Sequence, residues 1–385
     1  MTHSRDVITL FKLLRRMKII SVLLVISPFI TLCTTAEAQN ISLLFAGDAM
    51  QHQAQIDDAK KENGEYCYSD NFKYIKDEIS SVDLSVVNLE TPLATPPYSG
   101  YPAFCAPSQF AHALKECGFD LFLTANNHCL DKGSKGIRQT INTLDSLKIY
   151  HTGIYKNAAI RQKDYPLIMK KGDLRIAFLN YTYGTNGITA KSDCIIDYID
   201  TVLIKNDINA AQSKSSDIII ASLHWGEEYK LLPSESQRHL ARWLHKAGVR
   251  IVIGSHPHVI QPIEIETNND NEIEYVTVYS LGNFISNMRT KMTMGAIIFK
   301  LNIEKDGEKV TINAPQYSKI FTQRPVAIQG SPFCIIAADS TTTNNNKLPL
   351  KLRSDIKIFS YEADRIFSNH NKGSVYEYFW SKNIK

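Results

Sequence analysis

The feature that most constrains the fold of this chain is a short apolar run that recurs along it and ends each time in a polar or glycine-containing loop. Such runs are rich in β-branched and aromatic residues, which is typical of buried strands. They are ISLLFAGD (41–48), LSVVNLE (84–90), LFLTANNH (121–128), RIAFLNY (175–181), IIIASLHWG (218–226) and RIVIGSHPH (250–258). A chain built this way must bury several strands against other layers.

Helix-like segments lie between these runs. The clearest are SQFAHALKECG (108–118), SKGIRQTINTLDSLK (134–148) and SESQRHLARWLHKAGV (234–249), two of which end in a glycine or just beyond one. Alternating strands and helices predict an α/β layered fold with parallel strands. Residues 272–284, 295–305 and 308–320 look like hairpin strands, so antiparallel pairing is expected later in the chain. Residues 360–383 predict a terminal helix broken by a turn.

The first 38 residues have the layout of a secretory signal. A basic stretch from Lys12 to Lys18 precedes the apolar segment 19–32, and Ala36-Glu37-Ala38 fits a cleavage site. We therefore expect 1–38 to be a signal peptide and the protein to be exported, periplasmic or otherwise extracytoplasmic. The alternative is an uncleaved segment that keeps the protein associated with the membrane.

The net charge limits the classes of partner, and the cysteine content indicates whether disulfides can form. The net charge is +4, and without 1–38 it falls to about +1, so no basic surface for nucleic acid is expected. Six of the seven cysteines lie after residue 38, and an even number in an exported protein permits disulfides. Cys67 and Cys105, both in loop-like stretches, are the first pair to test.

Each predicted strand delivers metal-ligand side chains at its end. These are Asp48, Glu90, Asn127 with His128, His224, and His256 with His258. Ligands collect at the carboxyl ends of parallel strands, and carboxylate, amide and imidazole groups suit zinc, manganese or iron. Each residue alone could be a turn residue, a helix cap or a buried histidine, and the set could form a buried hydrogen-bond network. The set and its order favour a metal site.

The same set carries a family resemblance. The order AGDAM, NLETPL, TANNHCLDKG, HWGEEY, GSHPHVIQPIE and YSLGNF, from Ile41 to Phe284, resembles the bacterial capsule synthesis family of the CapA type, which serves poly-γ-glutamate capsule assembly. That family is similar to calcineurin-like metallophosphoesterases. The resemblance implies a four-layer α/β/β/α sandwich of metallophosphoesterase type with mixed sheets. Residues 39–302 would form its core, and the strands and helix of 303–385 would close the same domain.

The resemblance also implies roles for individual residues. Asp48 would bind the first metal and Glu90 would bridge two ions. Asn127, His224, His256 and His258 would complete a site for one or two divalent ions of Mn, Zn or Fe. His128, oriented by Asp131, would act as the catalytic group facing the leaving or attacking oxygen. Glu228 and Tyr229 would orient His224, and Asn283 would line the pocket.

Two positions depart from the metallophosphoesterase pattern. Met50 stands where a histidine is usual, and methionine is a poor ligand for a hard cation. His52 would compensate if its loop bends back. Glu90 replaces an aspartate and adds a methylene, so one tightly held metal or two unequal ones are expected.

Two functions follow from the resemblance. The first is an exported metal-dependent hydrolase or transferase acting on a cell-envelope polymer, such as a poly-γ-glutamate-like one, or on its phosphorylated precursor. The second is a non-catalytic assembly factor for capsule or surface polymer that keeps a remnant metal site. The expected partners are the polymer or its precursor and other capsule-assembly proteins.

Overall fold

The computed structural model describes residues 38–191, 193–325 and 332–380, and nearly all of the expected signal peptide lies outside these residues. Residues Gln39–Lys385 form one compact unit. Among the described residues, no helix combines the length and the apolarity needed to cross a bilayer.

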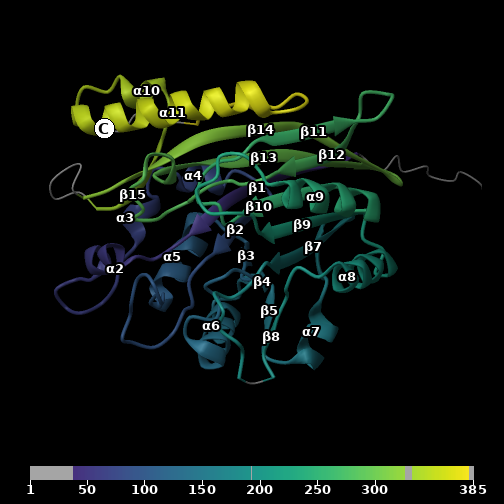
Figure 1. Cartoon of the computed structure of the whole chain (residues 1–385), viewed down its shortest axis with the longest axis horizontal. Helices are drawn as coiled ribbons and strands as arrows, with labels where there is room; N and C mark the ends of the chain where they lie inside the picture. The colour runs from purple at the N-terminus through teal and green to yellow at the C-terminus, as the bar shows by residue number, and fades with distance from the viewer. Residues whose placement is uncertain (1–37, 192, 326–331, 381–385) are drawn as a thin grey trace, which may run out of the picture. The chain divides into compact units, whose positions relative to one another are not determined.

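The helices of this unit, shown in Figure 1, are α2 Gln53–Ala59, α3 Ser69–Phe72, α4 Lys76–Ile79, α5 Ser108–Cys117, α6 Gly133–Ser146, α7 Ala158–Asp164, α8 Thr201–Ser213, α9 Glu235–Ala247, the 3-10 turn Lys291–Thr293, α10 Ser340–Thr343 and α11 Leu350–His370. The strands are β1 Gln39–Ala49, β2 Leu84–Leu89, β3 Leu121–Leu123, β4 Tyr150–Thr152, β5 Ile154–Tyr155, β6 Leu167–Lys171, β7 Leu174–Thr182, β8 Ile195–Ile196, β9 Ile218–His224, β10 Ile251–Ser255, β11 Ile263–Thr267, β12 Ile273–Val278, β13 Gly295–Asp306, β14 Lys309–Gln323, β15 Cys334–Ala337 and β16 Tyr376–Glu377. Each strand predicted from the apolar runs is present.

The main sheet has two halves. In the first half, β1, β2, β3 and β4 run parallel, and the long antiparallel hairpin β13–β14 continues the sheet from β1. In the second half, β7, β9, β10 and β12 run parallel, and β6 and β11 pair antiparallel at either side. Only the pair Ile273–Ile312 joins β12 to β14 in register. The two halves correspond to the two sheets of the predicted sandwich, and this one residue pair joins them into a single sheet.

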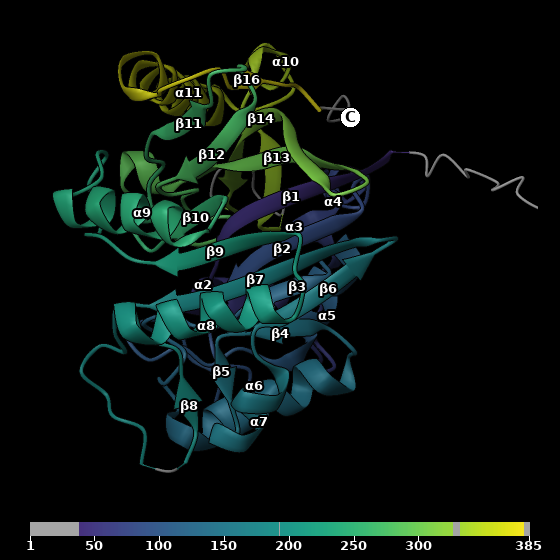
Figure 2. The ribbon, with the colours of Figure 1, turned by 90° about the vertical axis from the view of Figure 1, so that its right-hand side faces the viewer.

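The two halves face each other across a hydrophobic core. Phe45 and Val86 of the first half and Ile220 and Ile253 of the second belong to this core. Strand residues alternate between faces, so the neighbouring side chains point outward and pack under helices. On one outer face α5 packs on the first half, and on the other α8 and α9 pack on the second half (Figure 2). This order of helix, sheet, sheet and helix is the predicted four-layer sandwich.

Helix ends agree with the sequence signals. Ser234 caps the start of α9 through its side chain, which accepts a hydrogen bond from the backbone N–H of Gln237. Gly118 and Gly248, with φ of 119° and 114°, take the left-handed conformation that ends α5 and α9. The pairing pattern is less regular than predicted, because β6 and β7 already form an antiparallel hairpin in the parallel part of the chain.

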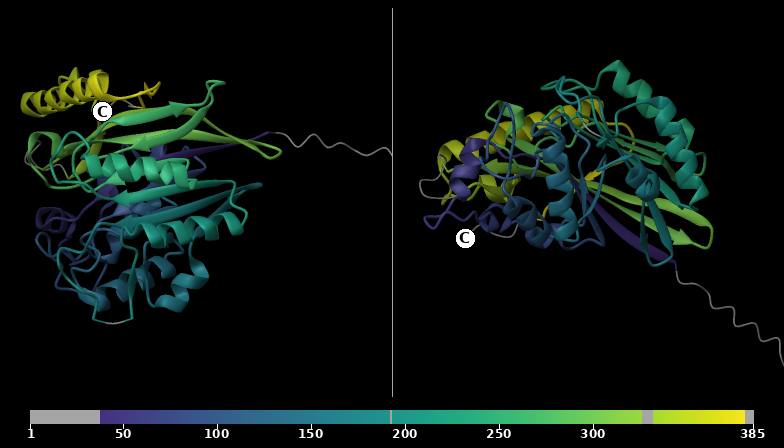
Figure 3. Two further views of the ribbon diagram at one scale, coloured as in Figure 1. Left: turned by 45° about the vertical axis from the view of Figure 1, so that its right-hand side comes forward. Right: turned by 90° about the horizontal axis from the view of Figure 1, so that it is seen from below.

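The C-terminal segment differs from its prediction. Helix α11 begins at Leu350, well before the predicted start, and the chain after His370 forms the short strand β16 beside β14 instead of a second helix. One face of α11 packs on the core through Ile356 and Phe359. It lies along β14, as Figures 1 and 3 show, and covers the part of the β13–β14 hairpin that the second half of the sheet does not reach.

Cysteine pairing also differs from the suggestion made by the sequence. Cys67 and Cys105 are free thiols, and their sulfur atoms lie close to the Ser69 hydroxyl and the Thr95 carbonyl oxygen respectively. The loops of this pair therefore hold their conformation without a disulfide.

Candidate metal centre

The candidate ligands meet because parallel strands from both halves end at the same edge of the sandwich. Gly47 forms a bulge in the pairing of β1 with β2, and bulges often re-aim a side chain beside a functional site. A Cβ at Gly47 would lie 1.9 Å from the carbonyl oxygen of Gly282, so only glycine permits this approach. The next residue, Asp48, donates its backbone N–H to the same oxygen at 3.0 Å.

Asp48 is fully buried and holds three neighbours. One carboxylate oxygen accepts a hydrogen bond from the side-chain amide of Asn88 at 2.8 Å. The other lies 3.2 Å from Nδ1 of His258 and 3.3 Å from the backbone nitrogen of His256. Burial alone would raise the pKa of Asp48, but the bond and charge of His258 outweigh it and lower this pKa below its usual value. Asp48 is therefore an anion at neutral pH.

Glu90 follows β2 and has no exposed surface. One carboxylate oxygen lies 3.5 Å from Nε2 of His224 and 3.8 Å from Nε2 of His258, and neither carboxylate oxygen has a hydrogen-bond partner. Burial and the adjacent Asp48 carboxylate raise the pKa of Glu90 well above its usual value. A buried carboxylate without a partner is costly in a folded protein, so Glu90 requires a functional explanation.

His224 is the last residue of β9, a strand of the second half of the sheet. Its Nδ1 lies 3.0 Å from the hydroxyl of Ser255, and its Nε2 lies 2.8 Å from the amide oxygen of Asn127. Burial lowers the pKa of His224 to about 3, so the ring is neutral. Ser255, on the adjacent strand β10, contacts this ring directly, and Glu228 acts on it electrostatically. That Glu228 and Tyr229 orient the ring stays a prediction.

His256 and His258 lie on a strained loop. Both are non-glycine residues in the positive-φ region, at 95° and 58°, and strain of this kind is concentrated at functional sites. Nδ1 of His256 is buried without a hydrogen-bond partner, and burial lowers the pKa of this residue to about 2. Burial also acts to lower the pKa of His258, but Glu90 and Asp48 outweigh it and raise it to about 9. Without a metal, His258 is therefore a cation that lies beside the Asp48 carboxylate and the Glu90 side chain.

His128 and Asp131 form a close pair at the edge of the cluster. Nδ1 of His128 lies 2.8 Å from a carboxylate oxygen of Asp131, which also accepts the backbone N–H of Phe104 at 2.7 Å. Burial lowers the pKa of His128, but the bond to Asp131 and the charge of Glu90 outweigh it, so the pKa is raised. His128 can therefore carry a proton at neutral pH, with Asp131 holding its orientation.

The remaining predicted residues lie at different distances from this cluster. Asn283 contacts it directly, since its amide oxygen lies 2.9 Å from Nδ1 of His258. Glu228 has a ligand atom within 4.8 Å of those of His256 and His258, so the three could bind one ion. Tyr229 donates its backbone N–H to the carbonyl oxygen of Pro257. His52 is the residue before α2, and its Nδ1 accepts a hydrogen bond from the backbone N–H of Asn287. Within the described part of the chain, His52 belongs to neither group of close ligand atoms. Buried Met50 therefore has no histidine substitute there.

Sequence reasoning missed the loop after β7. Tyr183 lies with its ring 4.5 Å from that of His256, and Asn186 accepts a hydrogen bond from the side chain of Asn127 at 3.3 Å. This loop follows RIAFLNY, one of the runs predicted as a strand, so its position at a strand end was the available signal. Neither residue type stands out as a metal ligand, which is why the signal was not used.

The donor set fits a divalent cation. Asp48, Glu90 and His258 place ligand atoms within 4.8 Å of one another, as do Glu228, His256 and His258. Both Glu90 carboxylate oxygens and Nδ1 of His256 are buried without a hydrogen-bond partner. Buried polar atoms are normally paired, so unpaired ones here are consistent with ligand atoms that would bind an ion. Oxygen and imidazole donors without thiolate suit Zn, Mn or Fe. The shared residue, His258, allows one ion or two adjacent ions.

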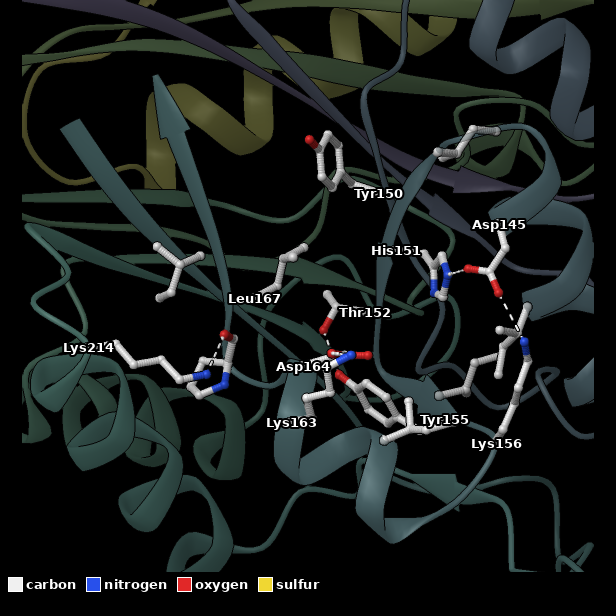
Figure 4. Close-up of a pocket in the computed structure, with 16 residues that line it drawn as sticks. Asp145, Tyr150, His151, Thr152, Tyr155, Lys156, Lys163, Asp164, Leu167 and Lys214 are labelled. Carbon is white, nitrogen blue, oxygen red and sulfur yellow. Dashed lines mark hydrogen bonds and ion pairs between the residues drawn. The ribbon is translucent and has the colours of Figure 1, made fainter. Parts of the chain in front are cut away.

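A large cavity lies elsewhere in the fold. It has a volume of about 590 Å³ and lies between the edge strands β4 and β6, with α6 and α7 beside it (Figure 4). His151 and Lys156, drawn as sticks there, are both paired with Asp145. None of the predicted ligands lines this cavity, so the two features are separate.

Several solved structures are partly similar to this chain. The NAD nucleotidase NadN of Haemophilus influenzae matches with a TM-score of 0.46 and 12% identity, covering 85% of this chain and 61% of that one. The calcineurin-like phosphoesterase YfkN of Bacillus subtilis matches with a TM-score of 0.44 and 12% identity, covering 84% of this chain and 98% of that one. At this level of similarity, these structures give no evidence about the function of this chain.

Sequence relatives are more informative. The chain is 25% identical over 303 residues to the capsule biosynthesis protein CapA of Bacillus anthracis, covering 75% of this chain and 70% of the relative. It is 31% identical over 198 residues to the PGA biosynthesis protein CapA of Bacillus subtilis strain 168, which is half of each chain. The family model for the bacterial capsule synthesis protein PGA_cap matches residues 42–288, which contain all the candidate ligands. This chain therefore belongs to the bacterial capsule synthesis protein PGA_cap family.

Proposed function

We propose that this protein is an exported metal-dependent hydrolase or transferase acting on a cell-envelope polymer or on its phosphorylated precursor. The observation that carries the proposal is the buried Glu90 carboxylate, which has no hydrogen-bond partner and lies among His224, His258 and Asp48. Burial and Asp48 disfavour the charged form of Glu90 in the metal-free site, and a bound cation would explain why an acidic side chain is kept there.

The ligands would be Asp48, Glu90, Asn127, His224, His256 and His258, with Glu228 at the outer side. A bound divalent cation would polarise a substrate oxygen and stabilise the negative charge that develops on it. Asn88 and Ser255 would fix the orientation of Asp48 and His224 through the hydrogen bonds described above.

His128 would supply the proton in this chemistry. Asp131 binds its Nδ1, so Nε2 is the nitrogen that can donate to the oxygen of the leaving group. The raised pKa favours the protonated ring, as a general acid requires. Phe104 packs edge-on against the ring at 4.6 Å between centroids and restricts its movement.

The substrate class follows from family membership together with the site. The names of the two relatives point to capsule and PGA biosynthesis, and we extend this to a poly-γ-glutamate-like or other envelope polymer for this chain. Other capsule-assembly proteins are the proposed partners. The proposed location is the cell envelope, outside the cytoplasm, with residues 1–38 as the export signal.

One observation supports a second function, that of a non-catalytic assembly factor in which the metal only holds the loops together. Met50 is buried beside Asp48 where the metallophosphoesterase pattern has a histidine, which leaves the first metal position one ligand short. This alternative predicts metal binding without turnover.

The test is metal analysis of the purified protein, combined with assays of phosphoester and polymer hydrolysis. We expect at least one Mn, Zn or Fe per chain, with the metal lost in His256→Ala and Asp48→Ala. The matched control is His245→Ala, which removes another buried histidine whose two nitrogens already contact Val249 and Thr277. This control should keep its metal.

Three outcomes separate the proposals. Loss of both metal and activity in the ligand variants supports the enzyme. Metal binding with no hydrolysis of any polymer or phosphoester supports the assembly factor. Unchanged metal content in both ligand variants refutes the metal centre.

A further inference from the structure

The cavity of about 590 Å³ lies where the two ends of the main sheet approach each other without pairing (Figure 4). Strand β4 ends the order of hydrogen-bonded strands on one side and β6 ends it on the other, and residues of both strands line the cavity. In the described part of the chain, β4 pairs only with β3, and β6 pairs only with β7. Open sheet edges of this kind are usually covered in folded proteins. The volume falls within the range of about 300–1,000 Å³ that is typical of sites for small molecules.

Much of the cavity lining is aliphatic, and it comes from α6, β5, α7, β6 and the turn before β4. The aliphatic side chains are Ile141, Ile149, Ile154, Ile160, Leu167 and Ile168. Ile160, Leu167 and Ile168 are half-buried, so part of their apolar surface faces solvent. Covering such surface with an apolar ligand is favourable, because it removes the surface from water. The lining therefore favours a ligand with an apolar body.

Most of the charged groups that line the cavity neutralise one another in pairs. The Lys156 ammonium lies 3.0 Å from one carboxylate oxygen of Asp145, and the other oxygen lies 3.1 Å from Nε2 of His151. The Lys163 ammonium lies 3.9 Å from Asp164, and both of these side chains are exposed. The third lysine of the lining is therefore the one that decides the sign of the charge that a ligand meets.

That third lysine is Lys214, which follows α8 and is half-buried. Its ammonium donates to the backbone carbonyl oxygens of Tyr165 at 3.0 Å and Pro166 at 3.4 Å. Within the described ranges, no carboxylate forms an ion pair with it. An ammonium has three N–H donors, so two carbonyl partners leave one donor and the full positive charge for a ligand. Figure 4 draws Lys214 on one side of the cavity and Asp145 on the other, with Leu167 between them.

We propose that this cavity binds a small amphipathic anion, with its anionic head on the Lys214 ammonium and its apolar body along the aliphatic lining. A carboxylate or a phosphate head can make this contact, since a hydrogen bond between two charged groups is stronger than one between neutral groups. A cationic head would meet like charge at Lys214, and a small polar anion would leave the aliphatic side chains uncovered. The inference is independent of the proposed function, because none of the candidate metal ligands lines the cavity.

The test is calorimetric binding to the full chain, with every probe kept below the concentration at which it forms micelles. The anionic probes are decanoate and decyl phosphate, and the control probes are decyltrimethylammonium and acetate. We expect at least one anionic probe to bind, and both control probes to bind more weakly by about tenfold or more. Lys214→Gln, which keeps a donor for the two carbonyl oxygens, and Ile160→Trp, which fills the cavity, should each weaken binding by about tenfold. The matched control is Lys205→Gln, an exposed lysine on α8 that does not line the cavity, and it should change nothing.

The outcomes separate this site from the metal centre. Binding should persist in chelator, and binding that requires metal overturns the assignment to the cavity. No binding by either anionic probe, equal binding by a control probe, or unchanged affinity in both cavity variants also overturns it. Urea denaturation shows whether each variant is folded, and because the two variants alter different elements, a folded one decides the result if the other is unfolded. A preference for decanoate or for decyl phosphate supports the site in either case and identifies the head group.

Discussion

Replacing Glu90 by glutamine should have opposite effects with and without metal. In the metal-free protein neither Glu90 oxygen has a hydrogen-bond partner, and burial together with the Asp48 carboxylate disfavours the charge of Glu90 more than the His258 imidazolium at 3.8 Å favours it. The amide has the same shape but no charge, so it is cheaper to bury. With metal, the same change removes an anionic ligand.

The magnitude follows from the cost of the unpaired group. An unsatisfied buried polar group costs about 1–3 kcal/mol, and more when it is charged. The amide would also be buried without partners, so only the extra cost of the charge is removed, and we expect Glu90→Gln to raise the free energy of unfolding in chelator by about 1 kcal/mol or more near pH 7.5. Saturating metal at 100 times its Kd stabilises the wild type by about 2.7 kcal/mol, and the variant should gain little of this.

The assay is urea denaturation in chelator and in excess Mn or Zn. The matched control is Glu78→Gln, because Glu78 has partners in the Lys300 ammonium and the Tyr378 hydroxyl, both at 2.7 Å. That variant should lose stability under both conditions by a similar amount. If Glu90→Gln is less stable than the wild type in chelator, or if it gains as much from metal, the argument from the unpaired carboxylate is refuted.

Three further predictions concern protons. Burial lowers the pKa values of His224 and His256 to about 3 and about 2, so at pH 6.5 and below the unfolded chain binds more protons at these two residues than the native one. Their contribution should make unfolding in chelator easier by about 2 kcal/mol from pH 6.5 to 5.5, and substituting both by asparagine should flatten that slope. His258 has a pKa raised to about 9 and must lose its proton to bind metal, so calorimetry in two buffers at pH 7.5 should detect about one proton released per site or more, and none released would contradict the assignment. Asp131→Asn removes the partner that raises the pKa of His128, so the fall in activity at high pH should move to lower pH with metal content unchanged; an unmoved profile would exclude His128 as the general acid.

The sequence identified the strands, the layered class and most of the cluster, because these depend on local pattern. A short apolar run with a polar end predicts a buried strand, and Gly118 and Gly248 end their helices through a conformation that glycine adopts easily. The order of strand-end residues was enough to indicate the family. What the sequence could not supply was any distance between those residues.

Tertiary structure decided the contacts within the site. The orientation of His224 by Ser255, the position of Tyr183 over His256 and the exclusion of His52 all depend on which strand lies next to which. The same holds for the pairing of β16 with β14 after α11, which local helix propensity did not reveal. Local pattern determines how each segment folds and which groups it offers, whereas contacts between segments are set by packing of the whole core.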